Sequence, residues 1–100
     1  MTSISEFLGF GAKNARTAKE LREILHISGD DVRELVRAER LDGVPICSRT
    51  AADESGRAGY FMPSCPDDFM QTIAQLRHRE KELARTRKAL EKAYKKRYTL

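Results

Sequence analysis

The feature that most constrains the fold is a long carboxy-terminal segment without glycine or proline. After Pro66 neither residue occurs again in the 100-residue sequence. Pro66 suits the first position of a helix, and Asp67 and Asp68 suit its first turn because the helix dipole favours negative charge there. A helix over residues 66–96 would be about 45 Å long at 1.5 Å per residue. The residues before it can form only a much narrower globule, so we expect this helix to project.

Apolar side chains recur along this segment at alternating spacings of four and three residues, which is typical of a coiled coil. Glu80 and Arg87 occupy two core positions of this seam, and each would face its own copy in a parallel, in-register pair. We therefore expect a homodimer whose helices pair in an antiparallel or staggered way. The seam consists of Phe69, Ile73, Leu76, Leu83, Leu90 and Tyr94.

The positive charge of the chain is concentrated at its carboxy-terminal end. The net charge is +4, but residues 77–100 carry ten Lys or Arg and three Glu, so the first 76 residues are net −3. Basic residues suit a helix C-terminus, yet a net +7 exceeds that need. The partner that such a segment most often binds is a nucleic-acid backbone, followed by an acidic protein. The basic tail comprises Arg85, Lys88, Lys92, Lys95, Lys96 and Arg97.

The first 64 residues contain signals for three short helices and a β-hairpin. Ser3 with Glu6 and Thr17 with Glu20 fit capping boxes, which predict helices over residues 4–8 and from 17 to about 26. Ser28 predicts the start of a third helix that ends before Gly43. Residues 44–49 and 58–62 are typical of two antiparallel strands. We expect the apolar core to include Ile4, Phe7, Leu8, Leu21, Ile24, Leu25, Val32, Leu35, Val36 and Leu41, with Phe10 packed nearby.

These elements predict a mainly α fold with a small β-hairpin (α+β). A domain over residues 1–64 would be followed by the long basic helix over residues 65–100. Residues 21–36 resemble a helix-turn-helix, with Leu21, Leu25, Ile27, Val32 and Leu35 placed to form its shared core.

Together with the hairpin, residues 14–63 resemble the winged helix-turn-helix family, and within it small proteins encoded by bacterial phages and mobile elements. Residues 14–21 and the two strand sequences, Pro45–Ser48 and Gly59–Phe61, carry the resemblance. Two positions depart from the family pattern. Arg22 stands where Ala usually faces the second helix closely, and His26 stands at a turn position that is usually Gly.

The resemblance implies that the helix after Ser28 reads the major groove of double-stranded DNA. The implied function is a phage-type transcriptional regulator or accessory replication factor that acts as a dimer. Between Asp30 and Arg40 this helix is net −1, so an ordinary solvated helix face is an alternative. Residues implied in groove reading are Ser28, Asp30, Arg33, Glu34 and Arg37. Residues implied in phosphate contacts before the motif and on the wing are Lys13, Arg16, Thr17, Arg49 and Arg57.

The rival interpretation is a protein-interaction module that binds its partner through the acidic winged domain or the apolar seam. An enzyme is not expected, because the catalytic and nucleotide-binding motifs HExxH, GxSxG and GxxxxGK[ST] are absent from the sequence. Cys47 and Cys65 match no zinc-ligand spacing and are expected to be reduced thiols. We expect no cofactor, no metal, no small-molecule substrate, no membrane segment or leader, and a cytoplasmic location.

Overall fold

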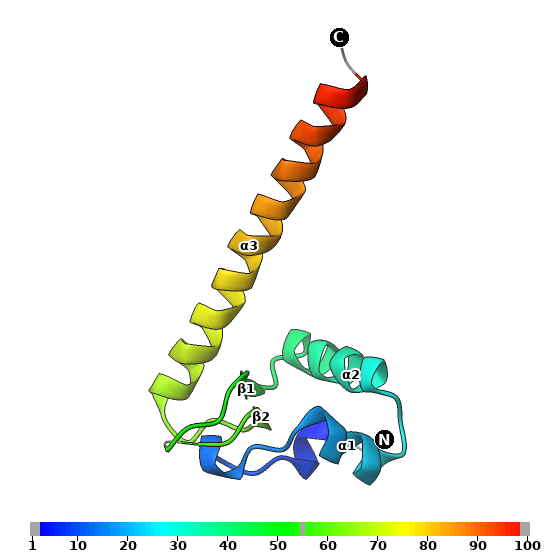
Figure 1. Ribbon diagram of the computed structural model, residues 1–100. Helices are drawn as coiled ribbons and strands as arrows, with labels where there is room; N and C mark the ends of the chain where they lie inside the picture. The colour runs from blue at the N-terminus through cyan, green and yellow to red at the C-terminus, as the bar shows by residue number, and fades with distance from the viewer. Residues whose placement is uncertain (1–2, 55, 99–100) are drawn as a thin grey trace.

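The computed structural model describes residues 3–54 and 56–98 (Figure 1). Two short 3-10 helices, η1 (Ile4–Phe7) and η2 (Ala12–Asn14), precede the helices α1 (Ala18–Leu25) and α2 (Gly29–Leu41). Strands β1 (Cys47–Arg49) and β2 (Gly59–Phe61) form an antiparallel hairpin, and α3 (Pro66–Tyr98) completes the chain. The expected α+β architecture of short helices, hairpin and long helix is confirmed.

Helix α3 projects from the remainder of the molecule, as its length requires (Figure 1). It contains 33 residues, and the molecule measures 56 Å along its longest axis against 29 and 25 Å along the others. The first turns of α3 pack on β1, where Thr72 is buried. The Thr72 hydroxyl accepts a hydrogen bond from the Ser48 N–H at 3.2 Å and donates to the Asp68 carbonyl at 3.0 Å. The helix is therefore anchored at one end only.

The two predicted caps at α1 and α2 are confirmed. Thr17 and Glu20 form a reciprocal capping box at the start of α1, and the Ser28 hydroxyl accepts from the Asp31 N–H at the start of α2. His26 ends α1 in the left-handed conformation, with φ of 55°, at the turn position that the resemblance assigns to Gly. Helices α1 and α2 then pack with η1 and the link before β1 around a core of Ile4, Leu8, Leu21, Val32, Val36 and Ile46.

The capping box predicted at Ser3 and Glu6 is wrong. Ser3 makes no cap within its own segment, which forms a short 3-10 helix. Its hydroxyl donates instead to the carboxylate of Glu39 on α2, which also accepts from the N–H groups of Ile4 at 2.7 Å and Ser5 at 3.2 Å. A carboxylate from a distant helix thus satisfies the free N–H groups at the start of η1, because a charged acceptor binds them more strongly than a hydroxyl does.

The expected core also needs correction at four positions. Phe10 and Leu41 are 67% and 74% exposed, while Ile24 and Leu35 are 36% and 38% exposed. Leu41 lies roughly 140° around α2 from buried Val36 at about 100° per residue, so it cannot share that face. Phe10 pairs with Met62 through a backbone bridge, and its side chain remains in solvent.

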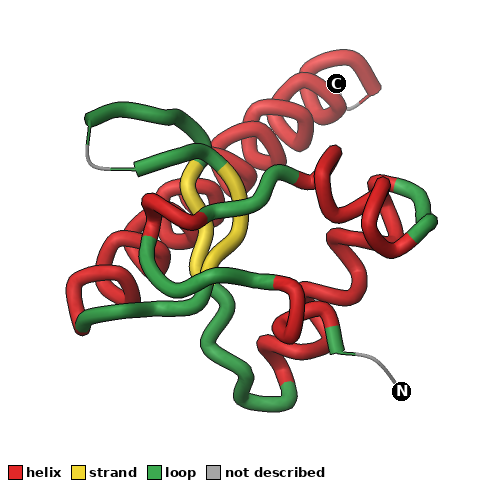
Figure 2. Tube along the Cα trace, turned by 90° about the horizontal axis from the view of Figure 1, so that it is seen from below, coloured by secondary structure: helices red, strands yellow, loops and turns green. Residues whose placement is uncertain are grey.

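The hairpin is shorter than the sequence indicates but has an additional neighbour. Pro45 has no N–H, and the Ile46 N–H bonds to the Val44 carbonyl at 2.9 Å, so the first strand begins only at Cys47. Across β2, Arg16 and Tyr60 exchange backbone hydrogen bonds of 2.9 and 2.8 Å. The segment before α1 therefore extends the hairpin, and Figure 2 shows the two strands crossing the middle of the molecule with α3 passing on one side.

Replacing Glu39 with Gln should destabilise the fold in a pH-dependent way. Burial opposes ionisation of Glu39, but the hydrogen bonds from Ser3, Ile4 and Ser5 outweigh it and lower its pKa. A lowered folded-state pKa contributes stability above the unfolded value of about 4.3, and that contribution is lost as the pH falls through the folded value. We expect a loss of about 1–2 kcal/mol at pH 7 that shrinks in acid, measured by urea unfolding from pH 7 to 3. Exposed Glu34→Gln on the same helix is the control, and a pH-independent loss in Glu39→Gln would contradict the assignment.

Two glycines with positive φ should respond differently to alanine. Gly59 has φ of 126°, and a Cβ there would lie 2.3 Å from the Arg16 carbonyl oxygen. Gly43 has φ of 94°, but a Cβ there would meet no atom within 4 Å. Gly43→Ala should therefore cost only backbone strain, about 1–2 kcal/mol, whereas Gly59→Ala should cost roughly 3 kcal/mol or more. Thermal unfolding measures both, and equal losses would show that Arg16 does not pack closely on β2.

Candidate nucleic-acid interface

Three arginines lie along one flank of α2. At about 100° per residue, Arg33, Arg37 and Arg40 fall within an arc of roughly 60°. Asp30 and Glu34 lie beside them on the more exposed side, and Arg33 makes an exposed ion pair with Asp30 at 3.7 Å. A pair this exposed contributes little to stability and leaves Arg33 able to move.

The five residues predicted for groove reading thus divide into different roles. Ser28 is occupied as the cap of α2, and Asp30 pairs with Arg33. Glu34 and Arg37 are exposed, and neither makes an ion pair with any other residue that the structure describes. Of the predicted set, Arg33 and Arg37 are therefore the cations available at this helix.

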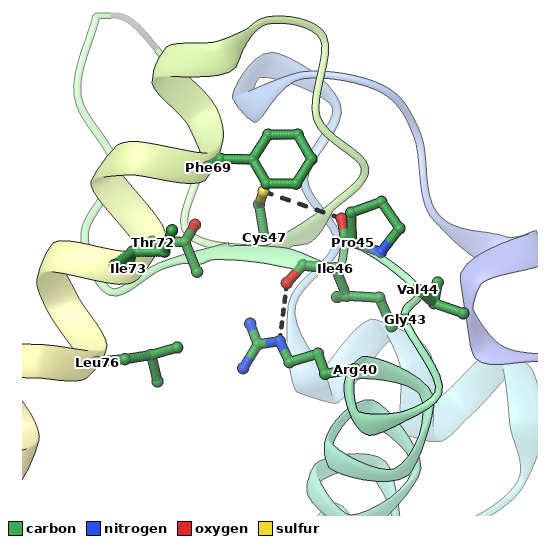
Figure 3. Close-up of a pocket in the computed structure, with 10 residues that line it drawn as sticks. All are labelled: Arg40, Gly43, Val44, Pro45, Ile46, Cys47, Phe69, Thr72, Ile73 and Leu76. Atoms are coloured by element: carbon green, nitrogen blue, oxygen red, sulfur yellow. Dashed lines mark hydrogen bonds between the residues drawn. The ribbon is translucent and has the colours of Figure 1, made fainter.

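Arg40 was not selected from the sequence, although it lies three residues after Arg37 on the same flank. Its Nε donates to the Ile46 carbonyl at 2.8 Å, and its Nη2 donates to the Ser48 hydroxyl at 3.2 Å. Burial lowers the pKa of Arg40, and the positive charge of Arg79 adds to this effect. Figure 3 shows its guanidinium held beside the link between α2 and β1.

Four arginines line one hollow between α2, the hairpin and α3. We call this cavity of about 430 Å³ the arginine hollow, and its arginines are Arg33, Arg40, Arg49 and Arg79. The guanidinium of Arg49 lies against Gly56 and Asp53, so the guanidiniums of the other three arginines are the ones available to the hollow. Hydroxyl-bearing side chains share its wall, whereas no Asp or Glu lines it. Arg79 was also missed by sequence reasoning, since only the packing of α3 on β1 brings it near α2. The hydroxyl-bearing residues of the wall are Thr17, Ser48, Thr50 and Tyr60.

The two arginines predicted to hold phosphates from the wing both make intramolecular ion pairs. The Arg49 side chain is only 13% exposed and its Nη2 lies 2.8 Å from an Asp53 carboxylate oxygen. Arg57 Nη2 lies 3.0 Å from Glu20, the capping residue of α1. The backbone N–H of Thr17 and then the charge of Arg57 lower the pKa of Glu20 against the opposing effect of burial. Arg57 therefore connects the wing to α1.

Two further predicted phosphate contacts precede α1. Lys13 is exposed on η2, and it makes no ion pair with another described residue. Arg16 is half-buried, and its backbone is paired with Tyr60. Thr17 caps α1 while also lining the arginine hollow. These three residues come from one segment and lie next to the hairpin.

Most of the basic residues of α3 lie on a single face. At about 100° per residue, seven of them fall within an arc of roughly 100°, and between Arg77 and Lys96 this arc includes no Asp or Glu. Six of the seven make no ion pair with another described residue, and Arg85 pairs with Glu82 at 3.1 Å. Arg97 lies outside this arc, over the Tyr98 ring at 5.5 Å. We call this face the basic stripe: Arg77, Lys81, Arg85, Lys88, Lys92, Lys95 and Lys96.

The apolar seam lies on roughly the opposite side of α3, about 150° around the helix from the basic stripe. Its first three residues, Phe69, Ile73 and Leu76, are 40–43% exposed and line a hollow of about 240 Å³ with residues 43–47 and Arg40 (Figure 3). We call this the apolar hollow. Leu83 and Leu90 are 71% and 67% exposed, so the seam continues into solvent beyond the globule.

Comparisons of the chain with protein-family models, curated proteins and solved structures found no match. The resemblance to the winged helix family therefore stays a prediction from the sequence. The candidate site combines a flank of arginines on α2, an arginine hollow and a basic stripe.

The remaining sequence expectations concern thiols, metals and membranes. Cys47 is buried, which raises the pKa of its thiol, and Cys65 is exposed; neither forms a disulfide. Within residues 3–54 and 56–98, no group of three or more His, Cys, Asp or Glu residues is placed to hold a metal ion. Among the same residues, no helix combines the length and apolar character needed to cross a membrane.

Proposed function

We propose that this protein binds double-stranded DNA, and the observation that carries the proposal is the basic stripe of α3. From Arg77 to Lys96 the stripe extends about 29 Å along a rigid helix. Duplex DNA presents one negative charge per about 1.7 Å of axis, so a row of cations can contact several phosphates at once. The helix dipole favours basic residues only in the last turn of a helix. It therefore does not account for a row of seven Lys and Arg that runs from Arg77 to Lys96 without an Asp or Glu among them.

The α2 flank supplies the part of the proposal that concerns sequence reading. Arg37 is exposed and Arg33 is held only by a weak surface pair, so both can reach base edges or phosphates. Asp30 and Glu34 beside them oppose the phosphates, so α2 alone would bind weakly. In this proposal the stripe supplies affinity and α2 adds selectivity, in a cytoplasmic regulator or accessory replication factor of the kind that the sequence resemblance implies.

Removing two charges from the stripe should weaken duplex binding more than removing two charges elsewhere. For Lys88→Gln with Lys92→Gln, we expect the affinity for a labelled random duplex to fall by about tenfold at low salt. The slope of log affinity against log salt should fall by about two, since each Lys contributes about one. Fluorescence anisotropy across a salt series measures both quantities.

The charge-matched control is Lys19→Gln with Arg22→Gln on α1, which keeps the same net charge and should change the affinity less than twofold. If the two double variants lose affinity equally, net charge rather than the stripe is responsible. If the unchanged protein does not bind duplex at low salt, the DNA-binding proposal is wrong and the protein-interaction alternative leads.

We further propose that the protein acts as a homodimer through the seam of α3. Leu83, Leu90 and Tyr94 are exposed on one side of the projecting helix, and they leave an apolar surface that a second helix would cover. An antiparallel pair centred near Leu83, or a parallel pair staggered by one heptad, places Glu80 against Arg87 of the second copy. The stripe lies on the opposite side of α3, so pairing through the seam leaves it accessible to DNA.

A charge exchange at the seam tests the pairing. Glu80→Arg and Arg87→Glu should each weaken the dimer by about fivefold, and the double variant should recover most of that loss. Sedimentation equilibrium measures the dimer dissociation constant, with Glu82→Arg, which lies off the seam, as the matched control. An in-register parallel pair would show no recovery, and a monomer at tens of micromolar would refute the dimer itself.

The alternative function, a protein-interaction module, is favoured by one specific observation. The apolar hollow adjoins the seam, so Phe69, Ile73 and Leu76 form a groove into which an amphipathic helix could insert. In this case the unchanged protein would recover one stoichiometric partner from nuclease-treated lysate, and Leu76→Asp would abolish that recovery while leaving duplex affinity unaltered.

A further inference from the structure

The arginine hollow concentrates positive charge from parts of the chain that are far apart in sequence. Arg33 and Arg40 come from α2, Arg49 from β1 and Arg79 from α3. Arg49 is already paired with Asp53, but the like charges of Arg33, Arg40 and Arg79 repel one another, and no Asp or Glu lines the wall of the hollow to offset that repulsion there. Such an arrangement is stabilised when an anion enters.

Part of the wall is fixed in place before any ligand arrives. Arg40 is held by the Ile46 carbonyl and the Ser48 hydroxyl, and Arg49 is held by Asp53 at 2.8 Å. Because Ser48 accepts from Arg40, its own hydroxyl hydrogen can point into the hollow. Arg33 and Arg79 are exposed and can adjust to a ligand, and Arg79 makes no ion pair with another residue in the described part of the chain. One fixed guanidinium, that of Arg40, and two adaptable ones, those of Arg33 and Arg79, therefore face the cavity.

We propose that the arginine hollow is a phosphate-binding site. Planar guanidinium groups match the oxygens of phosphate in paired hydrogen bonds, and several of them can share one group. A volume of about 430 Å³ corresponds to on the order of ten waters at about 30 Å³ each, which leaves room for two adjacent phosphates. A diphosphate also balances the charge of the three guanidiniums of Arg33, Arg40 and Arg79 better than one carboxylate does. If the phosphates in the hollow belong to duplex DNA, the inference rests on the proposed DNA-binding function. If they belong to a free diphosphate, it does not.

Thermal unfolding with inorganic pyrophosphate tests the site in the intact protein. With ionic strength held constant by sodium chloride, millimolar pyrophosphate should raise the unfolding midpoint of the unchanged protein by about 4 °C or more. Arg79→Gln should unfold at a higher temperature than the unchanged protein in buffer without phosphate, because it relieves repulsion with Arg40, and should gain little from pyrophosphate. A merely structural Arg79 would instead lower the midpoint in both conditions.

Arg22→Gln on α1 is the matched control, since it removes one exposed charge outside both the hollow and the stripe. It should retain the full pyrophosphate response. Equal responses in the unchanged protein, Arg79→Gln and Arg22→Gln would overturn the proposal, and so would the absence of any response in the unchanged protein.

Duplex binding identifies the source of the phosphate. If Arg79→Gln lowers duplex affinity and reduces the salt slope by about one while Arg22→Gln does not, the hollow binds the DNA backbone. If Arg79→Gln abolishes the pyrophosphate response but leaves duplex affinity unchanged, the hollow binds a free phosphate compound. A pyrophosphate response in a protein that binds no duplex would support the phosphate site while refuting the proposed DNA-binding function.

Discussion

A short chain of hydrogen bonds through Ser48 determines how α2, the hairpin and α3 are placed. The Ser48 hydroxyl accepts from Arg40 on α2, and its N–H donates to the Thr72 hydroxyl on α3. Arg40 also binds the Ile46 carbonyl, so the link between α2 and β1 is fixed at two points. These hydrogen bonds are partly buried, which makes an unpaired donor or acceptor among them costly. These hydrogen bonds through Ser48 position the arginine flank of α2, the wall of the arginine hollow and the direction of α3.

The surface of α3 separates an apolar face from a basic face, and the two proposed functions of these faces would interfere if they overlapped. An apolar seam buried in a helix pair excludes water, whereas a basic stripe must remain hydrated until it meets a polyanion. Their separation by about 150° allows one helix to carry both. Glu80 and Arg87 interrupt the seam, and they oppose the simplest parallel pairing while they complement each other in the alternatives. In the proposed dimer, the same residues that weaken the coiled-coil pattern would therefore determine its register.

Local signals in the sequence predicted the local structure well, because their partners lie within three or four residues. Thr17 and Glu20, Ser28, His26 and the start of α3 at Pro66 all behave as their neighbours dictate. The cap predicted at Ser3 was wrong because Glu39, 36 residues away, offers a stronger acceptor than any local group. No reading of residues 3–6 alone could reveal that competitor. The predicted length of the first strand was wrong for a different, local reason, since Ile46 bonds to Val44 within its own segment and Pro45 has no N–H.

The candidate site likewise contains some residues that local spacing could predict and others that only tertiary packing brings together. The basic stripe could have been predicted from the sequence, because helical spacing alone places Arg77 and Lys81 beside Lys88. It was missed because the charges were counted without being assigned to a face of the helix. Arg79 could not be assigned, since its approach to Arg40 arises only when Thr72 docks on Ser48. Tertiary contacts between charged residues 39 positions apart leave no periodic trace in a single sequence.

The positions of the arginine hollow and the basic stripe constrain how one duplex could use both. Arg79 lines the hollow, roughly 150° around α3 from the centre of the stripe. A straight duplex held in the hollow of one copy therefore lies on the wrong side of that copy's α3 to follow its stripe. In a pair joined through the seam, however, the stripe of the second copy faces outward on the other side of the first. Pairing would then do more than raise affinity, because it would bring a hollow and a stripe from different copies within reach of the same DNA.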